Sequence, residues 1–233
     1  MRDSSGIQRG EITNLTPASK QDLAHILWIG GAPDCGKSTV AESLAARLGI
    51  SVYHFDNNDA AQIETIARTV PEVERFLKAS LEERWIIPPP ESMFEFLLLT
   101  FPLRFRLVIE NLLQLPRQRP LIVEGYGLLP ELLQPLLTHT HQAIWFIPTV
   151  DFKRRSMTRR GKPSFATSLS NPEKARENLL ARDMLLAEYY RKQTSSLGCT
   201  LIEVDGALSA PQMTDLAEVH FARYLELISH QGG

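Results

Sequence analysis

Short apolar runs alternate with segments of helical periodicity along most of this chain of 233 residues. The apolar runs have strand length, and the helical segments repeat apolar residues at spacings of three and four. Such alternation favours a mainly parallel sheet with helices on both faces, an α/β fold. The predicted strands are 25–30, 50–55, 121–125, 143–147 and 200–204. The predicted helices are 37–48, 60–80 with a break near Pro71, 91–115 where Pro102 could introduce a kink, 130–137, 171–197 and 211–228.

Other segments lack this pattern. Residues 1–22 are polar and show no sustained periodicity, so we predict a mobile tail there. The proline-rich stretch 85–90 predicts an extended connection, because proline disfavours helix at its own position and at the one before it. The segment 151–160, after the fourth predicted strand, is strongly basic.

The turn after the first predicted strand has a complete G-x-x-x-x-G-K-[ST] pattern, which is a phosphate-binding loop. Its residues are Gly31, Ala32, Pro33, Asp34, Cys35, Gly36, Lys37, Ser38 and Thr39. The glycines let backbone N–H groups surround an anion, Lys37 reaches the β- and γ-phosphates, and the Ser38 hydroxyl can bind Mg²⁺. The loop lies between a predicted strand and a predicted helix, whose N-terminus adds positive charge. This context indicates a nucleoside-triphosphate site rather than a chance match.

Two acidic residues lie at the carboxyl ends of predicted strands. Ligands of parallel sheets collect at the carboxyl ends of the strands, so Asp56 and Glu124 should face the phosphate loop. Asp56 is our candidate for the base or the ligand of an acceptor hydroxyl; a turn-capping role is the alternative, and Asp59 is the second choice. Glu124 ends a Leu-Ile-Val-Glu run of Walker B type and is predicted to hold Mg²⁺ with Ser38, although acceptor contact fits it equally.

The basic segment offers positive charge for a phosphate. A solvated helix face is the plainer interpretation, but a segment at this place in the chain can also fold over bound phosphates. Arg155 and Arg159 lie four residues apart on one helical face and are our candidates for stabilising the transferring phosphoryl group. Arg182, in the next helix, is a further candidate.

The composition excludes several classes of protein. Hydrophobic residues make up 43%, charged residues 22%, and the net charge is −2, which argues against nucleic acid or an anionic membrane as a partner. No apolar stretch is long enough to span a bilayer, and we see no secretory signal. Cys35 and Cys199 make no disulfide framework, and the sum of these features predicts a cytoplasmic protein. Cys35 could be a redox switch or a spectator in the loop.

These residues together resemble the P-loop small-molecule kinases, a nucleoside/nucleotide-kinase-like group. The resemblance rests on the phosphate loop, Asp56, the strand 121–125 and the basic segment 153–162, and it extends over most of residues 25–228. It implies a three-layer α/β/α fold with five parallel strands in the order 2-3-1-4-5, and ATP and Mg²⁺ as cofactors. It also implies one domain over 23–230, with a helical acceptor-side insertion at 60–120 and an Arg-rich lid at 151–170. In chloramphenicol-phosphotransferase-like, zeta-toxin-like and 2-phosphoglycerate-kinase-like members, an acid after the second strand contacts the acceptor, which supports Asp56 by analogy.

Departures from the family keep other functions open. The chain has no Asn-Lys-x-Asp motif for guanine, which argues against a GTPase, and no zinc-binding lid cysteines. Residues 60–120 match no acceptor pocket that we recognise. We predict a kinase that phosphorylates a hydroxyl of a small molecule. The alternatives are a nucleotide-dependent switch protein and a kinase acting on nucleic-acid ends. The sequence leaves open the acceptor, ATP against GTP, and the oligomeric state, for which a homodimer is one option.

Overall fold

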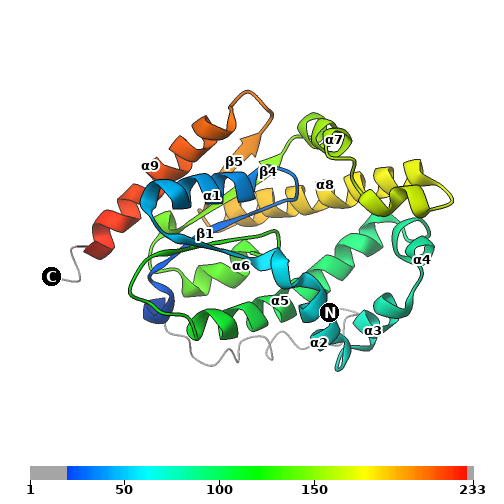
Figure 1. Cartoon of the computed structure of the whole chain (residues 1–233), viewed down its shortest axis with the longest axis horizontal. Coiled ribbons are helices and arrows are strands. Elements are labelled where there is room, and N and C mark those ends of the chain that lie inside the picture. Colours follow the sequence, from blue (N-terminus) through cyan, green and yellow to red (C-terminus); the bar gives the residue numbers. More distant parts are fainter. Residues whose placement is uncertain (1–19, 230–233) are drawn as a thin grey trace.

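The computed structural model describes residues 20–229, with a five-stranded parallel sheet at the centre. The strands are β1 Ile26–Gly31, β2 Ser51–His54, β3 Leu121–Glu124, β4 Ala143–Pro148 and β5 Thr200–Val204. They pair in the spatial order β2-β3-β1-β4-β5, which confirms the five predicted strands and the order 2-3-1-4-5 (Figure 1). In the register, His54 of β2 and Ile29 of β1 both lie opposite Glu124 of β3.

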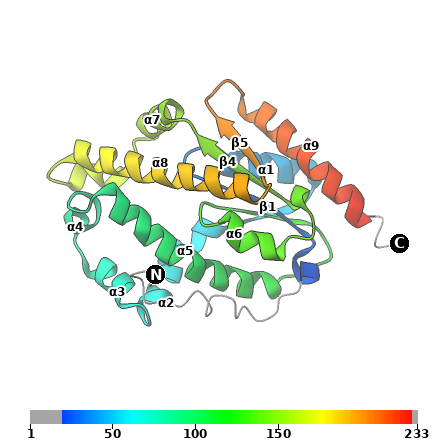
Figure 2. The same cartoon turned by 180° about the vertical axis from the view of Figure 1, so that it is seen from behind.

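Helices cover both faces of this sheet, giving the expected three layers (Figure 2). The first face carries α1 Lys37–Leu48 and α9 Ala210–Ser229, and the second carries α5 Pro90–Leu113, α6 Pro130–Leu133 and α8 Pro172–Ser196. Neighbouring strand residues point to opposite faces. Trp28 therefore packs with α5 and α8, whereas Leu27 and Ile29 pack with α1 and α9. All residues of β1 and β4 are buried, as expected for central strands of a parallel sheet.

The segment between β2 and β3 is a helical insertion, and its elements before α5 are α2 Asp59–Ala67, α3 Pro71–Lys78 and α4 Leu81–Trp85. The predicted helix 60–80 is two helices, because Pro71 begins the second one at a position where its missing N–H is not needed. The sequence did not predict α4, which a reciprocal capping box between Ser80 and Glu83 starts. The extended connection between α4 and α5 is therefore shorter than the predicted 85–90. Helix α5 continues through Pro102 as one helix.

The basic segment forms α7 Val150–Arg159, which begins where the Thr149 hydroxyl accepts a hydrogen bond from the Phe152 N–H. A 3-10 helix at Ser164–Ser168 then leads to α8, whose first turn is capped by Asn171. At the other end of the chain, residues 1–19 of the predicted tail lie outside the described residues. Lys20–Leu23 forms a 3-10 helix with Leu23 buried. Within residues 20–229 we find no helix with the length and apolar character needed to cross a bilayer.

Candidate active site

The phosphate loop joins β1 to α1 and is fixed tightly against β4. A Cβ atom at Gly31, where φ is +121°, would come within 1.8 Å of the Phe146 carbonyl oxygen, so only glycine fits. The next residue, Ala32, donates its N–H to the same oxygen at 3.0 Å. Asp34 and Gly36 also have positive φ, 63° and 87°, and they curl the loop. The strand, loop and helix therefore have the arrangement that the motif requires.

Lys37 is buried at the first position of α1 and turns back over its own loop. Its ammonium donates to the Ala32 carbonyl at 2.8 Å and lies 3.8 Å from the Cys35 sulfur. The N-cap residue of α1 is Gly36, which has no side chain to cap the helix, so the first N–H groups of α1 can bind a phosphate. The Cys35 side chain is fully buried, and burial raises the pKa of its thiol despite the nearby Lys37. This environment fits a spectator better than a redox switch.

Glu124 lies at the carboxyl end of β3, directly beside the loop. The Ser38 hydroxyl donates to its Oε1 at 3.2 Å, and His54 Nδ1 lies 2.7 Å from the same oxygen. The carboxylate is buried. The structure thus brings the predicted metal pair Ser38 and Glu124 together. The described residues contain no cluster of three or more His, Cys, Asp or Glu side chains suited to a metal. A hydroxyl and one carboxylate nevertheless fit Mg²⁺, which usually binds one or two carboxylates with waters and substrate phosphates.

Asp56 lies in a 3-10 helix, Phe55–Asn58, directly after β2, and its Oδ1 is 3.8 Å from Arg104 of the insertion. Burial raises the pKa of its carboxyl to about 6, against the opposing effect of the Lys37 and Arg104 charges, and the Glu124 and Asp59 charges raise it further. Its Oδ1 atom is buried and accepts no hydrogen bond within the described part of the chain. A carboxylate with a pKa near neutrality and a vacant acceptor oxygen has the properties of a general base.

Arg104 of α5 is the functional candidate that the sequence did not reveal. Its side chain is 1% exposed, and Nη2 lies 2.8 Å from Asp59 Oδ1 and 3.8 Å from Asp56 Oδ1. Its Nε donates to Gln62, its Nη1 donates to the Tyr126 hydroxyl, and Nη2 makes no hydrogen bond within the described residues. The only hint in the sequence is one cation within an otherwise apolar stretch of the helix, 97–105.

Asp34 of the phosphate loop holds the basic segment in place. Lys153 Nζ lies 2.6 Å from Asp34 Oδ2, while Lys162 and Arg160 lie 2.8 and 3.3 Å from Oδ1. Lys153 is fully buried and also pairs with Asp183 of α8 at 2.5 Å. Burial by itself would raise the pKa of the Asp34 carboxyl, but the Lys153 and Lys162 charges outweigh it and lower the pKa to about 2. The basic segment is therefore docked on the phosphate loop.

The two arginines proposed from sequence take other positions. Arg155 donates to the Asp205 backbone carbonyl at 2.9 Å, and Arg159 is exposed. Both lie on α7, whereas Arg160 and Lys162, which reach Asp34, come just after the helix ends. Helical spacing could not identify residues whose contacts depend on the chain leaving the helix. The roles of Arg155 and Arg159 stay predictions.

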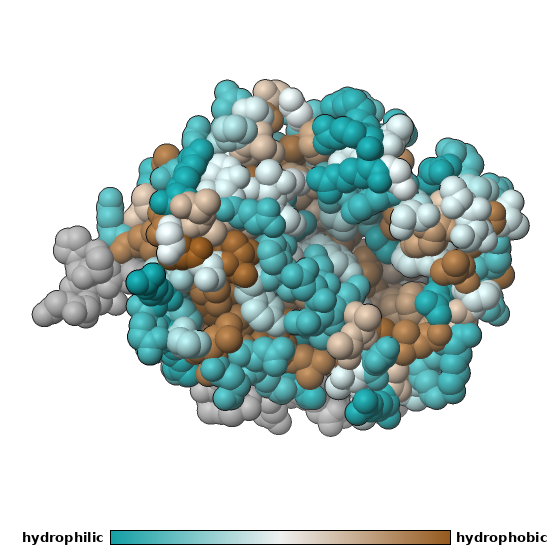
Figure 3. Space-filling model, viewed as in Figure 1, coloured by the Kyte–Doolittle hydropathy of each residue, from teal (hydrophilic) through white to brown (hydrophobic). Residues whose placement is uncertain are grey.

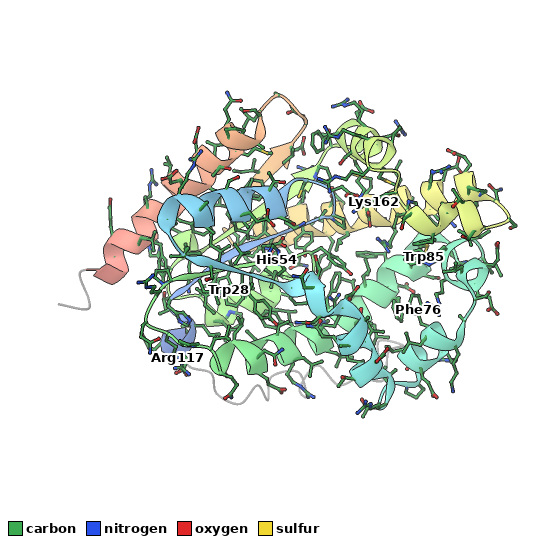
Figure 4. The ribbon with its side chains drawn as sticks, viewed as in Figure 1. Trp28, His54, Phe76, Trp85, Arg117 and Lys162 are labelled. Atoms are coloured by element: carbon green, nitrogen blue, oxygen red, sulfur yellow. The ribbon has the colours of Figure 1, made fainter. Side chains whose placement is uncertain are left out.

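A cavity of about 310 Å³ lies between the insertion and α8. Its walls include Phe76, Trp85 and Phe96, and Asp59, Arg104 and Arg182 also line it. Figure 3 shows a hollow with apolar residues between the sheet and the α3–α4 part of the molecule. In Figure 4, Trp85 and Phe76 lie together among the helices of the insertion.

Comparisons with known proteins add limited information. No family model matches this chain, and no curated protein matches it. Similar solved structures include TT1252 from Thermus thermophilus, with a TM-score of 0.47, 21% identity and coverage of 87% of this chain and 97% of that one. A gluconokinase from Sinorhizobium meliloti 1021 has a TM-score of 0.45, 15% identity and coverage of 89% and 97%. A deoxyadenosine kinase from M. mycoides has a TM-score of 0.46, 12% identity and coverage of 85% and 99%. All these TM-scores are below 0.5.

Proposed function

We propose that this protein is an ATP- and Mg²⁺-dependent kinase that transfers the γ-phosphate to a hydroxyl of a small molecule bound in the cavity. The main support is Asp56, whose pKa is raised to about 6 and whose Oδ1 accepts no hydrogen bond among the described residues. It follows β2 at the same sheet edge as the phosphate loop, and the Lys37 charge acts on its carboxyl. On the other side Arg104, which lines the cavity, lies 3.8 Å from it. A base between a phosphate site and a cavity suits transfer from one to the other.

On the donor side, the N–H groups of the loop and of α1 bind the phosphates. Lys37 exchanges the Ala32 carbonyl for β- and γ-phosphate oxygens. Ser38 and Glu124 would hold Mg²⁺, which neutralises charge on the phosphates when bound. Arg160 and Lys162 lie on the loop through Asp34 and can shift to the phosphates, where they would stabilise the transition state.

On the acceptor side, Asp56 takes the proton from the hydroxyl while the hydroxyl oxygen forms a bond to the γ-phosphorus. The bond from that phosphorus to the β–γ bridging oxygen breaks, and ADP leaves with the electron pair. Arg104 orients the hydroxyl next to the base, and Asp59 holds Arg104 by an ion pair at 2.8 Å. The protein thus acts mainly by positioning and by charge, as phosphoryl transfer requires.

The test uses ATP labelled in the γ-phosphate, a metabolite mixture and mass detection of the phosphorylated product. The wild-type protein should yield one labelled product, and Asp56→Asn should lower its rate about 10²- to 10⁴-fold, the usual contribution of a general base. ATP affinity should stay within about three-fold in that variant, whereas Lys37→Ala should lose it. The exposed Glu72→Gln, on α3, is the matched control and should behave as wild type.

The pH profile separates a base from a capping residue. Because Asp56 must be ionised to accept a proton, kcat/KM should rise with pH through a limb near the pKa of about 6. A capping role predicts no such limb. Tight ATP binding with no phosphorylated product would instead favour the nucleotide-switch alternative, and unchanged turnover in Asp56→Asn would refute the assignment of the base.

A further inference from the structure

The cavity beside Arg104 has one polar end and one apolar end. At the apolar end, the rings of Phe76 and Phe96 stack at 4.2 Å between centroids, and Trp85 meets Phe76 edge-on at 6.5 Å. Met93 and Leu97 of α5 also line the cavity. All three rings line the cavity, and an apolar wall of aromatic side chains favours the burial of another aromatic ring. The apolar end therefore suits a flat hydrophobic body.

Around the polar end, where Asp59 and Arg104 line the cavity, several buried atoms make no hydrogen bond within the described residues. They are Asp56 Oδ1, an acceptor, together with Arg104 Nη2 and Gln62 Nε2, both donors. The Arg104 and Gln62 side chains are 1% and 4% exposed. Arg104 Nη2 has Asp59 Oδ1 as an ion-pair partner at 2.8 Å but makes no hydrogen bond. Buried polar atoms without hydrogen bonds are costly, so a ligand that supplies them is favoured. A single hydroxyl can satisfy two of them, since it donates to Asp56 and accepts from Arg104, 3.8 Å away.

The charged groups on the cavity walls are already engaged. Arg182 pairs with Asp183 at 2.6 Å, and its guanidinium lies 5.6 Å from the centre of the Trp85 ring. Arg84 donates to the backbone carbonyl groups of Leu77 and Ala79.

The acidic groups on the walls have partners as well. Glu83 accepts from Ser80, and Asp59 pairs with Arg104. No carboxylate on the walls named here is left for a polycation, and the apolar walls give a polyol few partners.

We infer that the acceptor is an uncharged alcohol with a flat aromatic body, its hydroxyl between Asp56 and Arg104 and its ring against Phe96, Phe76 and Trp85. This inference rests on the proposed kinase function, because Asp56 is taken as the group that faces the reacting hydroxyl. Phe96 is the specificity-determining residue in this arrangement. It stacks on Phe76 and lines the cavity, whereas Phe94 of the same helix contacts Tyr189 instead.

Binding is measured without ATP by tryptophan fluorescence. Trp28 and Trp145 are fully buried in the core, so Trp85 is the tryptophan that reports on the cavity. The probes are 2-naphthylmethanol and 3-phenylpropan-1-ol, against uridine, glucose and kanamycin. The two aromatic alcohols should change the emission in a saturable manner, and Trp85→Phe should abolish the change. A response to glucose, uridine or kanamycin with none to the aromatic alcohols would overturn the inference.

Turnover is then measured with the same probes and labelled ATP. Phe96→Ala should raise the KM for the aromatic alcohols about ten-fold or more, since lost stacking and burial weaken binding. Phe94→Ala, the matched control, should leave KM within about two-fold, and thermal unfolding shows whether both variants are folded. Phosphorylation of glucose, uridine or kanamycin in preference to the aromatic alcohols contradicts the acceptor class but leaves the kinase intact. Saturable binding of aromatic alcohols without any phosphorylated product contradicts the kinase but supports the cavity's preference.

Discussion

Replacing Asp56 by asparagine should make the protein more stable while it destroys phosphate transfer. The carboxyl pKa rises from 3.8 to about 6 in the folded state, which means that folding disfavours its ionised form. A shift of about 2 pKa units corresponds to roughly 3 kcal/mol at about 1.4 kcal/mol per unit. The side chain is 37% exposed, so solvent screens part of this penalty. We therefore expect Asp56→Asn to gain about 1 kcal/mol at pH 7.

The sign of the pH dependence comes from proton binding. Between pH 3.8 and about 6, the folded protein holds a proton on Asp56 that the unfolded chain has lost. Stability of the wild-type protein therefore falls as pH rises through this window, as far as Asp56 is concerned. Asparagine has no such proton. The stability difference between variant and wild type should thus be near zero below pH 3.8 and complete above about pH 6.

Urea unfolding of the nucleotide-free protein at pH 3.8, 5 and 7 gives the free energies of unfolding. The matched variant is Asp59→Asn, which removes the closer partner of the buried Arg104 and should destabilise the protein at pH 7. If Asp56→Asn instead loses stability at pH 7, attraction to Arg104 outweighs burial, and the assignment of Asp56 as a destabilised base is refuted. A gain that does not change with pH would refute the linkage argument.

Two further substitutions test the phosphate loop. Asp34→Asn should lower stability by about 2 kcal/mol at pH 7, because the pKa of Asp34 falls from 3.8 to about 2 in the folded state. That stabilising contribution is present above pH 3.8 and is lost as pH falls towards 2. In urea unfolding, the stability of the variant should therefore fall less between pH 3.8 and 2 than that of the wild-type protein. An equal loss of stability in both proteins would contradict the ion network. Gly31→Ala should prevent stable folding, because the added Cβ would clash with the Phe146 carbonyl oxygen. Gly49→Ala, whose Cβ would have no atom of the described residues within 4 Å, should lower stability by only about 1 kcal/mol. Thermal melting followed by circular dichroism distinguishes the two variants, and equal effects would contradict the packing argument.

The sheet could be predicted from sequence because its signals are local. Residues of β1 and β4 are apolar without interruption, as strands buried on both faces must be, and the phosphate-loop motif requires a helix directly after β1. Helix α4 could not be found in the same way. It is only five residues long, it is held by a capping box, and its Trp85 carbonyl accepts a hydrogen bond from Asn178 of α8. This hydrogen bond joins residues 93 positions apart, so no local sequence pattern predicts it.

The same difference between local and long-range signals holds for the candidate site. Ser38 and Glu124 could be placed together because both lie at the carboxyl-terminal edge of one parallel sheet. The hydrogen bond of 3.2 Å from the Ser38 hydroxyl to Glu124 agrees with that reasoning. The position of Arg104 in the site could not be predicted, because Arg104 lies in the middle of a long helix whose orientation depends on how the insertion packs. Likewise Lys153 appears as one cation among several in the sequence, and only the fold buries it between Asp34 and Asp183.

Two aspartates beside one phosphate loop have opposite pKa shifts, and this contrast separates their roles. Asp34 has cations on both oxygens, and its pKa of about 2 marks a group that the folded protein satisfies completely. Asp56 has a raised pKa, an arginine at 3.8 Å and an oxygen that accepts no hydrogen bond among the described residues. When the pKa values of neighbouring carboxyl groups are shifted in opposite directions, one group commonly has a structural role and the other a chemical one. A carboxylate that is already neutralised gains nothing from a ligand, whereas Asp56 gains a hydrogen bond when a hydroxyl arrives. The group that folding leaves unsatisfied is therefore the one placed to meet the acceptor.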